Sequence, residues 1–211
     1  MVEVYYYVPS KDAENLIDCG IKLSQWYDRK IILNSEPKKC LTAYLNPRDN
    51  MEKYRDTSLT CLKLLVEEKY CYVCDGALYS MSMNNPCLTQ LFYESIVPVD
   101  KYIFGTYMLP ECLVTTTIIG GFIREMNKKQ DSPILFENSA ELYLRNIIET
   151  NRDKNPQFDN MLLFYFFSSL AEISEIDKIV DKENKWVIFR NRRTNKIITL
   201  RVPDINEVDV L

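Results

Sequence analysis

Apolar and polar positions alternate over several short runs of the chain, which is the pattern of β-strands with one buried face. The runs are rich in Val, Ile, Leu, Tyr and Cys, and many are bounded by Pro, Gly, Asn or Asp. They predict strands at residues 3–8, 30–33, 41–45, 61–66, 70–74 and 111–119. Residues 186–190 and 196–202 alternate around the polar segment 191–195, which predicts a hairpin.

Helical signals are strongest in the last third of the chain. Capping residues, Gly stop signals and apolar periodicity predict helices at residues 10–17, 51–57, 120–128, 139–150 and 158–176. Residues 79–107 are irregular, which indicates either short elements that periodicity does not reveal or a functional loop. Strands come first and helices are mixed in later, so the sequence predicts an α+β fold. With no repeat and no Gly- or Ser-rich linker, residues 1–211 are expected to form one domain.

Composition then narrows the class of protein. The chain has 46% hydrophobic and 12% aromatic residues, which excludes a disordered protein. No apolar run reaches the roughly 18 residues of a membrane span. The segment MVEVYYYVPSKD has no basic region followed by an apolar stretch, as a secretory signal would. We therefore expect a cytoplasmic protein without a membrane partner.

Histidine is absent, and this removes Ser-His-Asp triads, Cys-His dyads and His-containing zinc sites together. Carboxylates, Tyr, Lys or Cys must then do any acid–base work. The seven cysteines are scattered through apolar segments and are expected to be reduced. Cys71 and Cys74 form a CxxC, but no second ligand pair exists, and residues three apart on a strand face opposite sides. Packing in the core is the favoured interpretation, and no metal site is expected.

Charge gives only a local hint of nucleic-acid binding. The net charge of −4 argues against a broadly basic binding face. The one basic concentration lies in the predicted hairpin, where Arg192 and Arg193 could contact nucleic-acid phosphates. A solvated hairpin tip is the alternative.

Two residues have an unusual setting. Arg48 lies in the turn Asn46-Pro47-Arg48-Asp49, where Pro presets the backbone and a fixed guanidinium can grip phosphate. Glu111 stands at the head of an apolar strand, where it is either a solvated edge charge or a rigid carboxylate at the rim of a cleft. Neither residue is diagnostic alone.

Four segments between residues 4 and 125 follow the order and approximate spacing of one known family. They are Val4-Tyr5-Tyr6-Tyr7 with Asn15-Leu16-Ile17 and Gly20-Ile21, Tyr44-Leu45-Asn46-Pro47-Arg48 with Met51, Val73-Cys74-Asp75-Gly76, and Pro110-Glu111-Cys112-Leu113-Val114. The chain thereby resembles the DarT family of bacterial ADP-ribosyltransferases. That family has a first strand ending in Tyr-His, a Tyr-Phe-x-Pro-Arg…Met turn, a strand ending in Asp-Gly and a Glu-x-Leu-Val strand.

The resemblance implies an ADP-ribosyltransferase-like fold, with a split mixed or antiparallel sheet and flanking helices, and NAD as co-substrate without a metal. It implies that Arg48 serves the bound NAD and that Glu111 is catalytic. At the place of the family's histidine this chain has Tyr6 or, alternatively, Tyr7, and a Tyr hydroxyl can both donate to and accept from a ribose. The nicotinamide ring is expected to stack on Tyr54, Tyr79 or Tyr93.

The implied reaction transfers ADP-ribose to a base of single-stranded DNA, as a toxin or defence effector with an antitoxin protein as partner. Glu111 would stabilise the oxocarbenium-like transition state and draw a proton from the acceptor. RNA or protein acceptors are alternatives. So are a catalytically inactive NAD- or nucleic-acid-binding module of the same fold and an unrelated α+β protein-interaction domain. Convergence of Arg48, Glu111 and Tyr6 on one cleft would separate the last hypothesis from the others.

Overall fold

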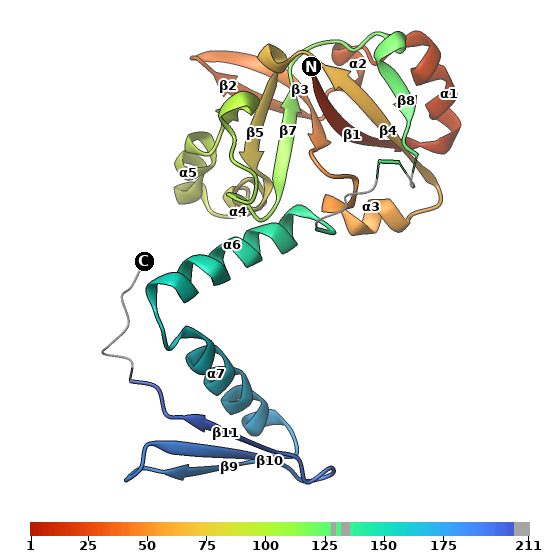
Figure 1. Cartoon of the computed structure of the whole chain (residues 1–211). Coiled ribbons are helices and arrows are strands. Elements are labelled where there is room, and N and C mark those ends of the chain that lie inside the picture. Colours follow the sequence, from red (N-terminus) through yellow and green to blue (C-terminus); the bar gives the residue numbers. More distant parts are fainter. Residues whose placement is uncertain (128–129, 132–135, 205–211) are drawn as a thin grey trace. The chain divides into compact units, whose positions relative to one another are not determined.

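The computed structural model describes residues 1–127, 130–131 and 136–204 (Figure 1). By internal packing the chain divides into two compact units, Met1–Arg145 (unit 1) and Asn146–Leu211 (unit 2). The sequence predicts one domain, and no linker composition marks the boundary, because it falls inside helix α6 (Ser139–Lys154). The α+β class, with a mostly antiparallel sheet and flanking helices, is confirmed.

Unit 1 is built on an eight-stranded sheet with the order β6-β5-β7-β3-β1-β4-β8, in which β2 also pairs with β3. Every pairing in it is antiparallel. The strands are β1 (Val2–Pro9), β2 (Arg29–Leu33), β3 (Glu36–Tyr44), β4 (Leu59–Val66), β5 (Cys71–Asp75), β6 (Val97–Pro98), β7 (Pro110–Val114) and β8 (Ile123–Glu125). Each of the six runs that predict strands in this unit overlaps one of these, but the run 111–119 is too long, because β7 ends at Val114.

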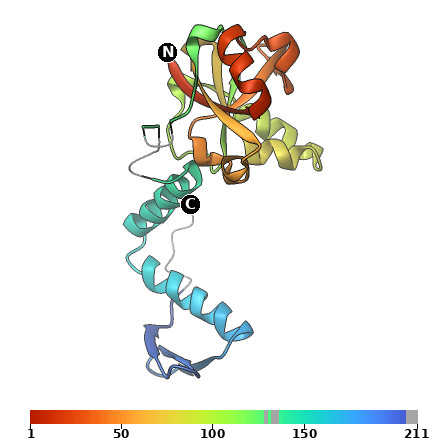
Figure 2. The ribbon, with the colours of Figure 1, turned by 90° about the vertical axis from the view of Figure 1, so that its right-hand side faces the viewer.

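The helices of unit 1 are short. They are α1 (Ser10–Cys19), α2 (Leu23–Trp26), α3 (Met51–Arg55), α4 (Gly76–Ser82) and α5 (Thr89–Glu94), with single 3-10 turns at Pro47–Asp49, Glu68–Tyr70, Pro86–Leu88, Val99–Lys101 and Gly120–Phe122. Helix α1 lies next to β4 and β8, and α4 and α5 lie beside β5 at the other end of the sheet (Figures 1 and 2). The irregular segment 79–107 therefore contains short elements. They are too brief for a period of 3.6 to show.

The helix predicted at residues 120–128 is wrong over the residues that the structure describes. A 3-10 turn begins at Gly120, and strand β8 follows and pairs with β4. A Cβ on Gly120 would lie 2.5 Å from the carbonyl oxygens of Ile17 and Asp18. Gly120 is thus needed where two backbones meet, and it does not open a helix.

The sheet is split between β1 and β3. Strand β1 pairs with β4 along its whole length, but with β3 only at Tyr5 and Tyr44. Beyond that pair, the Asp28 carboxylate accepts hydrogen bonds from the Thr42 backbone nitrogen at 3.0 Å and from Thr42 Oγ1 at 2.8 Å. Because Asp28 satisfies this backbone donor of β3, the two central strands can separate without an unpaired N–H group.

Lateral pairing assigns the side chains to the two faces of the sheet. Tyr5, Tyr44, Glu111 and Cys74 pair in turn across β1, β3, β7 and β5, so they share one face. The apolar core on that face includes Phe92 of α5. On the other face α1 covers a second core, whose members include Val4, Val8, Leu62, Leu64 and Val114.

Unit 2 contains α7 (Phe158–Ile173) and the antiparallel sheet β11-β10-β9, formed by β9 (Ile176–Asp181), β10 (Trp186–Asn191) and β11 (Ile197–Arg201). The predicted hairpin is confirmed as β10 and β11. The sequence does not predict strand β9, because Asp177 and Lys178 interrupt its apolar positions and Ile176 falls in the helix predicted at residues 158–176. Val187 and Phe189 of β10 are buried, and the Phe189 ring centroid lies 5.6 Å from that of Phe167 on α7. Within the described ranges, no helix has both the length and the apolar composition to cross a membrane.

Candidate functional site

Glu111 lies in the middle of the sheet of unit 1. All five residues of β7 are buried, and Glu111 is 9% exposed. Its lateral neighbours are Tyr44 on β3 and Cys74 on β5. A carboxylate at such a position is costly unless a partner compensates the loss of water.

Arg29 is that partner, and nothing in the sequence marks it beyond its position before a short apolar run. Its Nη2 lies 2.8 Å from Glu111 Oε2, and the arginine side chain is only 9% exposed. The guanidinium carbon lies 3.5 Å from the centroid of the Tyr79 ring, and Nη1 lies 3.8 Å from Cys74 Sγ. Burial by itself lowers the pKa of Arg29, but Glu111, together with Cys74 and Tyr79, outweighs burial and the pKa is raised. Contacts with Tyr79 and Cys74 therefore hold Arg29 in place against Glu111.

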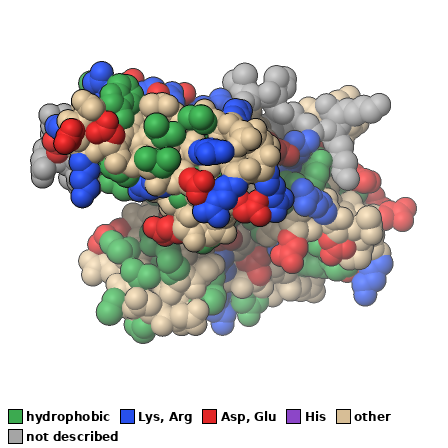
Figure 3. Space-filling model, turned by 90° about the horizontal axis from the view of Figure 1, so that it is seen from below, with side chains coloured by type: hydrophobic (Ala, Val, Ile, Leu, Met, Phe, Trp, Pro, Cys, Tyr) green, Lys and Arg blue, Asp and Glu red, His purple; other side chains and the backbone are tan. Residues whose placement is uncertain are grey.

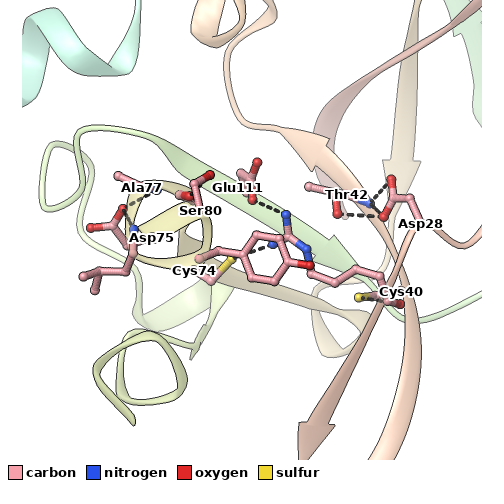
Figure 4. A network of polar contacts seen from close by, with 12 residues as sticks. Asp28, Cys40, Thr42, Cys74, Asp75, Ala77, Ser80 and Glu111 are labelled. Carbon is pink, nitrogen blue, oxygen red and sulfur yellow. Dashed lines mark hydrogen bonds and ion pairs between the residues drawn. The ribbon is translucent and has the colours of Figure 1, made fainter. Parts of the chain in front are cut away.

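The other carboxylate oxygen of Glu111, Oε1, takes no part in the contact with Arg29. Among the described residues, Oε1 has no hydrogen-bond or ion-pair partner. Figure 4 shows Glu111 bound through one oxygen, with Cys74 and Asp75 on one side and the Asp28–Thr42 pair on the other. A carboxylate held at one oxygen and open at the other is oriented to bond a ligand hydroxyl.

Gly76 leaves the space that Glu111 occupies. It begins α4, where the Asp75 side chain caps the helix by accepting from the backbone nitrogens of Ala77 and Leu78. A Cβ on Gly76 would lie 2.6 Å from Glu111 Cδ and 2.8 Å from its Cγ. The Asp75-Gly76 motif thus has two functions here: it caps a helix and it makes room for the carboxylate.

Gly76→Ala is expected to destabilise the protein by about 1–3 kcal/mol, although Ala is the better helix former, because the new methyl group must displace Glu111 from Arg29. Denaturant unfolding measures the change. In a Glu111→Ala background the same substitution should be neutral or stabilising, and an equal loss in both backgrounds would contradict the steric explanation.

Arg48 lies in a turn that a capping box fixes. The Asn46 side chain accepts from the Arg48 backbone nitrogen, and the Asp49 side chain accepts from the Asn46 nitrogen. Arg48 Nη1 is 3.5 Å from Glu137 Oε1, and its guanidinium carbon is 5.5 Å from the Tyr54 ring centroid. Its Nε is buried and has no acceptor among the described residues. A buried donor without an acceptor is unfavourable, and a bound anion would compensate it.

Two tyrosines join this turn to the row that contains Glu111. Tyr7 donates a short hydrogen bond to the Pro47 carbonyl, and the Tyr44 hydroxyl accepts from Asn50 Nδ2 at 3.1 Å. The rings of Tyr7 and Tyr44 contact each other edge to face, with centroids 6.1 Å apart. The structure thus brings the Arg48 turn and Glu111 to the same face of the sheet.

Tyr6 does not share that face, so the expected convergence of Arg48, Glu111 and Tyr6 on one cleft is not found. It alternates with Tyr5 and Tyr7 on β1, pairs with Leu62 and packs against the core under α1. Burial, with a smaller contribution from Asp28, raises the pKa of Tyr6 to about 12. Of the two candidates for the position of the family's histidine, Tyr7 is the one on the Glu111 side, because a strand changes face at every residue.

The tyrosines predicted to stack on nicotinamide lie at different places. Tyr54 lies next to Arg48, whereas Tyr79 lies against the Arg29 guanidinium and Tyr93 packs beside the core under α5. Tyr54 is therefore the best placed of the three for a ligand held by Arg48. Tyr79 has a structural contact that the sequence did not indicate.

Asp49 adds an ionisable group beneath the Arg48 turn. It accepts from the backbone nitrogen of Ser139 at 2.7 Å and from Ser139 Oγ at 3.0 Å. Desolvation raises the pKa of Asp49 to about 6, although the hydrogen bonds from Ser139 and Asn46 oppose the shift. The carboxyl therefore titrates near pH 6, and it ties the turn to the start of α6.

Stability should report this titration. Because the folded-state pKa lies above the ordinary value of 3.8, the contribution of Asp49 is full below about pH 4 and is lost as the pH rises through about 6. Relative to Asp49→Asn, the wild type should lose roughly 2–3 kcal/mol of unfolding free energy between pH 4 and pH 7. Denaturant melts at several pH values measure this difference, and a difference that does not change with pH would refute the shift.

The basic residues proposed for nucleic acid are neutralised within unit 2. Arg192 Nη2 lies 2.7 Å from Asp177 Oδ1, and Arg193 forms a short ion pair with Glu175. Both arginines are exposed, but each meets a carboxylate of its own unit. The prediction that they contact phosphates therefore has no support from their surroundings.

The cysteines of the CxxC motif belong to two different cores, Cys71 under α1 and Cys74 beside Arg29, as their spacing on a strand predicts. In the part of the chain that the structure describes, no cluster of three or more Cys, Asp or Glu side chains could hold a metal ion. No family model matches this chain, and neither a curated protein nor a solved structure matches it.

Proposed function

We propose that the protein is an NAD-dependent ADP-ribosyltransferase that modifies a base of single-stranded nucleic acid, with Glu111 as its catalytic residue. The observation that carries the proposal is the buried carboxylate of Glu111, which Arg29 holds through one oxygen while the other has no partner among the described residues. The order of motifs that resembles the DarT family adds the reaction and the co-substrate.

Glu111 would act on the sugar. Cleavage of the bond between nicotinamide and the anomeric carbon develops positive charge on the ribose, and a fixed carboxylate lowers the energy of that charge. Oε1 would accept a hydrogen bond from the ribose 2′-hydroxyl, while Arg29 keeps Oε2 in place. The acceptor nitrogen or oxygen then bonds to the anomeric carbon, and its proton passes to Glu111 or to water.

Arg48 would hold the pyrophosphate. Its buried Nε lacks an acceptor among the described residues, and its contact to exposed Glu137 is long enough for an anion to replace. Tyr7 and Tyr44 flank the split between β1 and β3 and would position the ribose, a role expected from the sequence for Tyr6. These features fit a dinucleotide with two phosphates and a ribose near the carboxylate.

The acceptor is proposed from the resemblance, and an antitoxin protein that removes the modification is the corresponding partner. Incubation with labelled NAD and mixed single-stranded oligonucleotides tests the proposal. We expect label on the oligonucleotide and release of nicotinamide, both abolished in Glu111→Ala. Label on the protein alone would exclude a nucleic-acid acceptor, and no transfer to any acceptor would exclude the activity.

Two observations favour a second candidate, a catalytically inactive NAD-binding module. A Tyr stands at the position of the family's histidine, and Arg29 engages Glu111. Calorimetric titration with NAD distinguishes the two functions. Tight binding that Arg48→Ala weakens, without nicotinamide release, would support the binding module.

A further inference from the structure

Helix α7 of unit 2 is apolar on both of its faces. Phe164 and Phe167 point to the sheet, where their ring centroids lie 6.3 and 5.6 Å from that of Phe189 on β10. Ser168 lies on the same side, because its Oγ accepts a hydrogen bond from Lys178 Nζ at 2.9 Å. A helix that is apolar all round normally lies in a protein interior, so the face of α7 that turns away from the sheet needs an explanation.

That face, which we call the outer face of α7, is formed by Leu162, Phe166, Ser169 and Ile173. At about 3.6 residues per turn these residues form one stripe along the helix, opposite the residues that contact the sheet. Leu162 is 47% exposed, Phe166 56% and Ile173 82%. Ser169 is also exposed, but its Oγ donates to the Tyr165 carbonyl at 3.0 Å, so burial of this hydroxyl would leave no donor unsatisfied.

The exposed apolar area of α7 is about that of a dimer interface. Leu163 and Tyr165, which are 43% and 45% exposed, lie at the edges of the outer face and add to it. A large side chain has roughly 150–250 Å² of surface, so the exposed parts of these two and of Leu162, Phe166 and Ile173 amount to roughly 500 Å². A homodimer interface buries about 800 Å² on each partner and is about 65% apolar, which also requires roughly 500 Å².

The outer face is complementary to a second copy of itself. Its residues are four, three and four positions apart, so the spacing is the same in both directions along the helix. An antiparallel copy related by a two-fold axis therefore places Leu162 against Ile173, and Phe166 against Ser169. The second contact sets a bulky ring against the smallest side chain of the stripe, and large residues opposite small ones let helices interdigitate. Spacings of three and four residues are also typical of helices that pack at a shallow angle.

The charges around the outer face argue against other kinds of partner. Helix α7 contains no Lys or Arg, and its two charged residues are Asp159 and Glu172. Anionic lipid surfaces and nucleic acids both select helices that are rich in Lys and Arg. With 16 residues, α7 is also shorter than the roughly 20 residues of a membrane span. A second apolar protein surface is the remaining match for this face.

The side of the sheet that turns away from α7 has a different character. There Asp177 pairs laterally with Arg190, and Asp181 pairs with Trp186. Ile197 is an apolar residue among these charges, on the strand next to Arg190. Figure 3, which views the protein from below, likewise shows acidic and basic side chains mixed with hydrophobic ones. A surface with charges of both signs is well solvated, so we expect the interface on α7 and not on the sheet.

We propose that two copies of this chain associate through the outer faces of their α7 helices, which pack antiparallel about a two-fold axis. The dimer then has the layer order sheet, helix, helix and sheet, in which both faces of each α7 are covered. Unit 2 is accordingly a dimerisation unit. This inference does not depend on the proposed function of unit 1.

Sedimentation equilibrium of the full chain tests the association, and we expect twice the mass of one chain. Phe166→Glu should raise the dissociation constant of the dimer by roughly 100-fold or more, because each dimer would bury the new charge twice. Ile173→Glu should also dissociate the dimer, and at 82% exposure Ile173 does not belong to the core of the single chain. Circular dichroism shows whether both variants keep the fold.

Ile197→Glu is the matched control, because it replaces an apolar residue that is 60% exposed on the side of the sheet away from α7. It should leave the dimer intact. Wild-type chain that sediments as a monomer would overturn the proposal, and so would a dimer that Ile197→Glu dissociates as readily as Phe166→Glu.

Cross-linking tests the antiparallel arrangement. The exposed native cysteines, Cys19 and Cys87, are first replaced by Ser. A mixture of Leu162→Cys chains and Ile173→Cys chains should then form disulfide-linked dimers on mild oxidation. Either variant alone should not, because its two cysteines would lie roughly 16 Å apart, or eleven residues at about 1.5 Å per residue. Efficient cross-linking of either variant alone would contradict the antiparallel arrangement, as would a mixture that does not cross-link.

Discussion

Arg29→Met is expected to lower the unfolding free energy by about 3–5 kcal/mol, the largest loss of stability that we expect from a single substitution in this chain. The methionine leaves Glu111 in the middle of the sheet, 9% exposed and without its counter-ion. A buried carboxylate that loses its only ion-pair partner must either remain charged at high cost or take up a proton.

The double variant Arg29→Met/Glu111→Leu distinguishes this explanation from simple loss of packing. It removes both charges, and apolar replacements of buried ion pairs are often neutral or stabilising. We expect it to recover most of the stability lost in Arg29→Met, as measured by urea unfolding. A double variant as unstable as the single one would show that the stacking of Arg29 on Tyr79 matters more than the charge pair.

Glu111→Gln is expected to reduce the rate constant of ADP-ribosyl transfer by roughly 10²–10³, with KM for NAD changed less than about threefold. The amide keeps the shape of the side chain and can still accept from Arg29, so the fold should persist. The negative charge that stabilises the developing cation is lost, and that charge acts in the transition state far more than in the ground state. Single-turnover kinetics with labelled NAD measure both constants.

Glu125→Gln is the matched control for this substitution. Glu125 lies on β8 of the same sheet and is exposed, so its replacement should leave the transfer rate unchanged. A rate that falls as much in Glu125→Gln as in Glu111→Gln would attribute the effect to net charge. A rate unchanged in Glu111→Gln would remove Glu111 from the catalytic role.

Much of the architecture could be predicted from local signals. Apolar runs located every long strand of unit 1, and the turn residues around Arg48 marked a break that proved to be a capped 3-10 turn. The elements of segment 79–107 and strand β9 were missed for different reasons. The first are too short to show a period, and the second has polar residues at Asp177 and Lys178 that break an apolar alternation.

The candidate site was harder to predict, because its members lie far apart in the sequence. Glu111 could be selected as a charge in an apolar strand, but Arg29, its partner 82 positions earlier, had no motif of its own. Gly76 could be recognised as part of an Asp-Gly pair. Only the positions of Glu111 Cγ and Cδ show that Gly76 also makes room for the carboxylate.

The sequence by itself determined the class of fold, the absence of histidine chemistry and the turn that carries Arg48, because these depend on composition and on neighbours in the chain. Only the tertiary structure decided which side chains meet. Strand pairing places Tyr7 rather than Tyr6 on the face of Glu111, pairs Arg29 with that carboxylate, and neutralises Arg192 and Arg193. The physical reason is that a shift of one residue along a strand moves a side chain to the opposite face of the sheet. Contacts between residues far apart in the sequence then decide which charges are compensated.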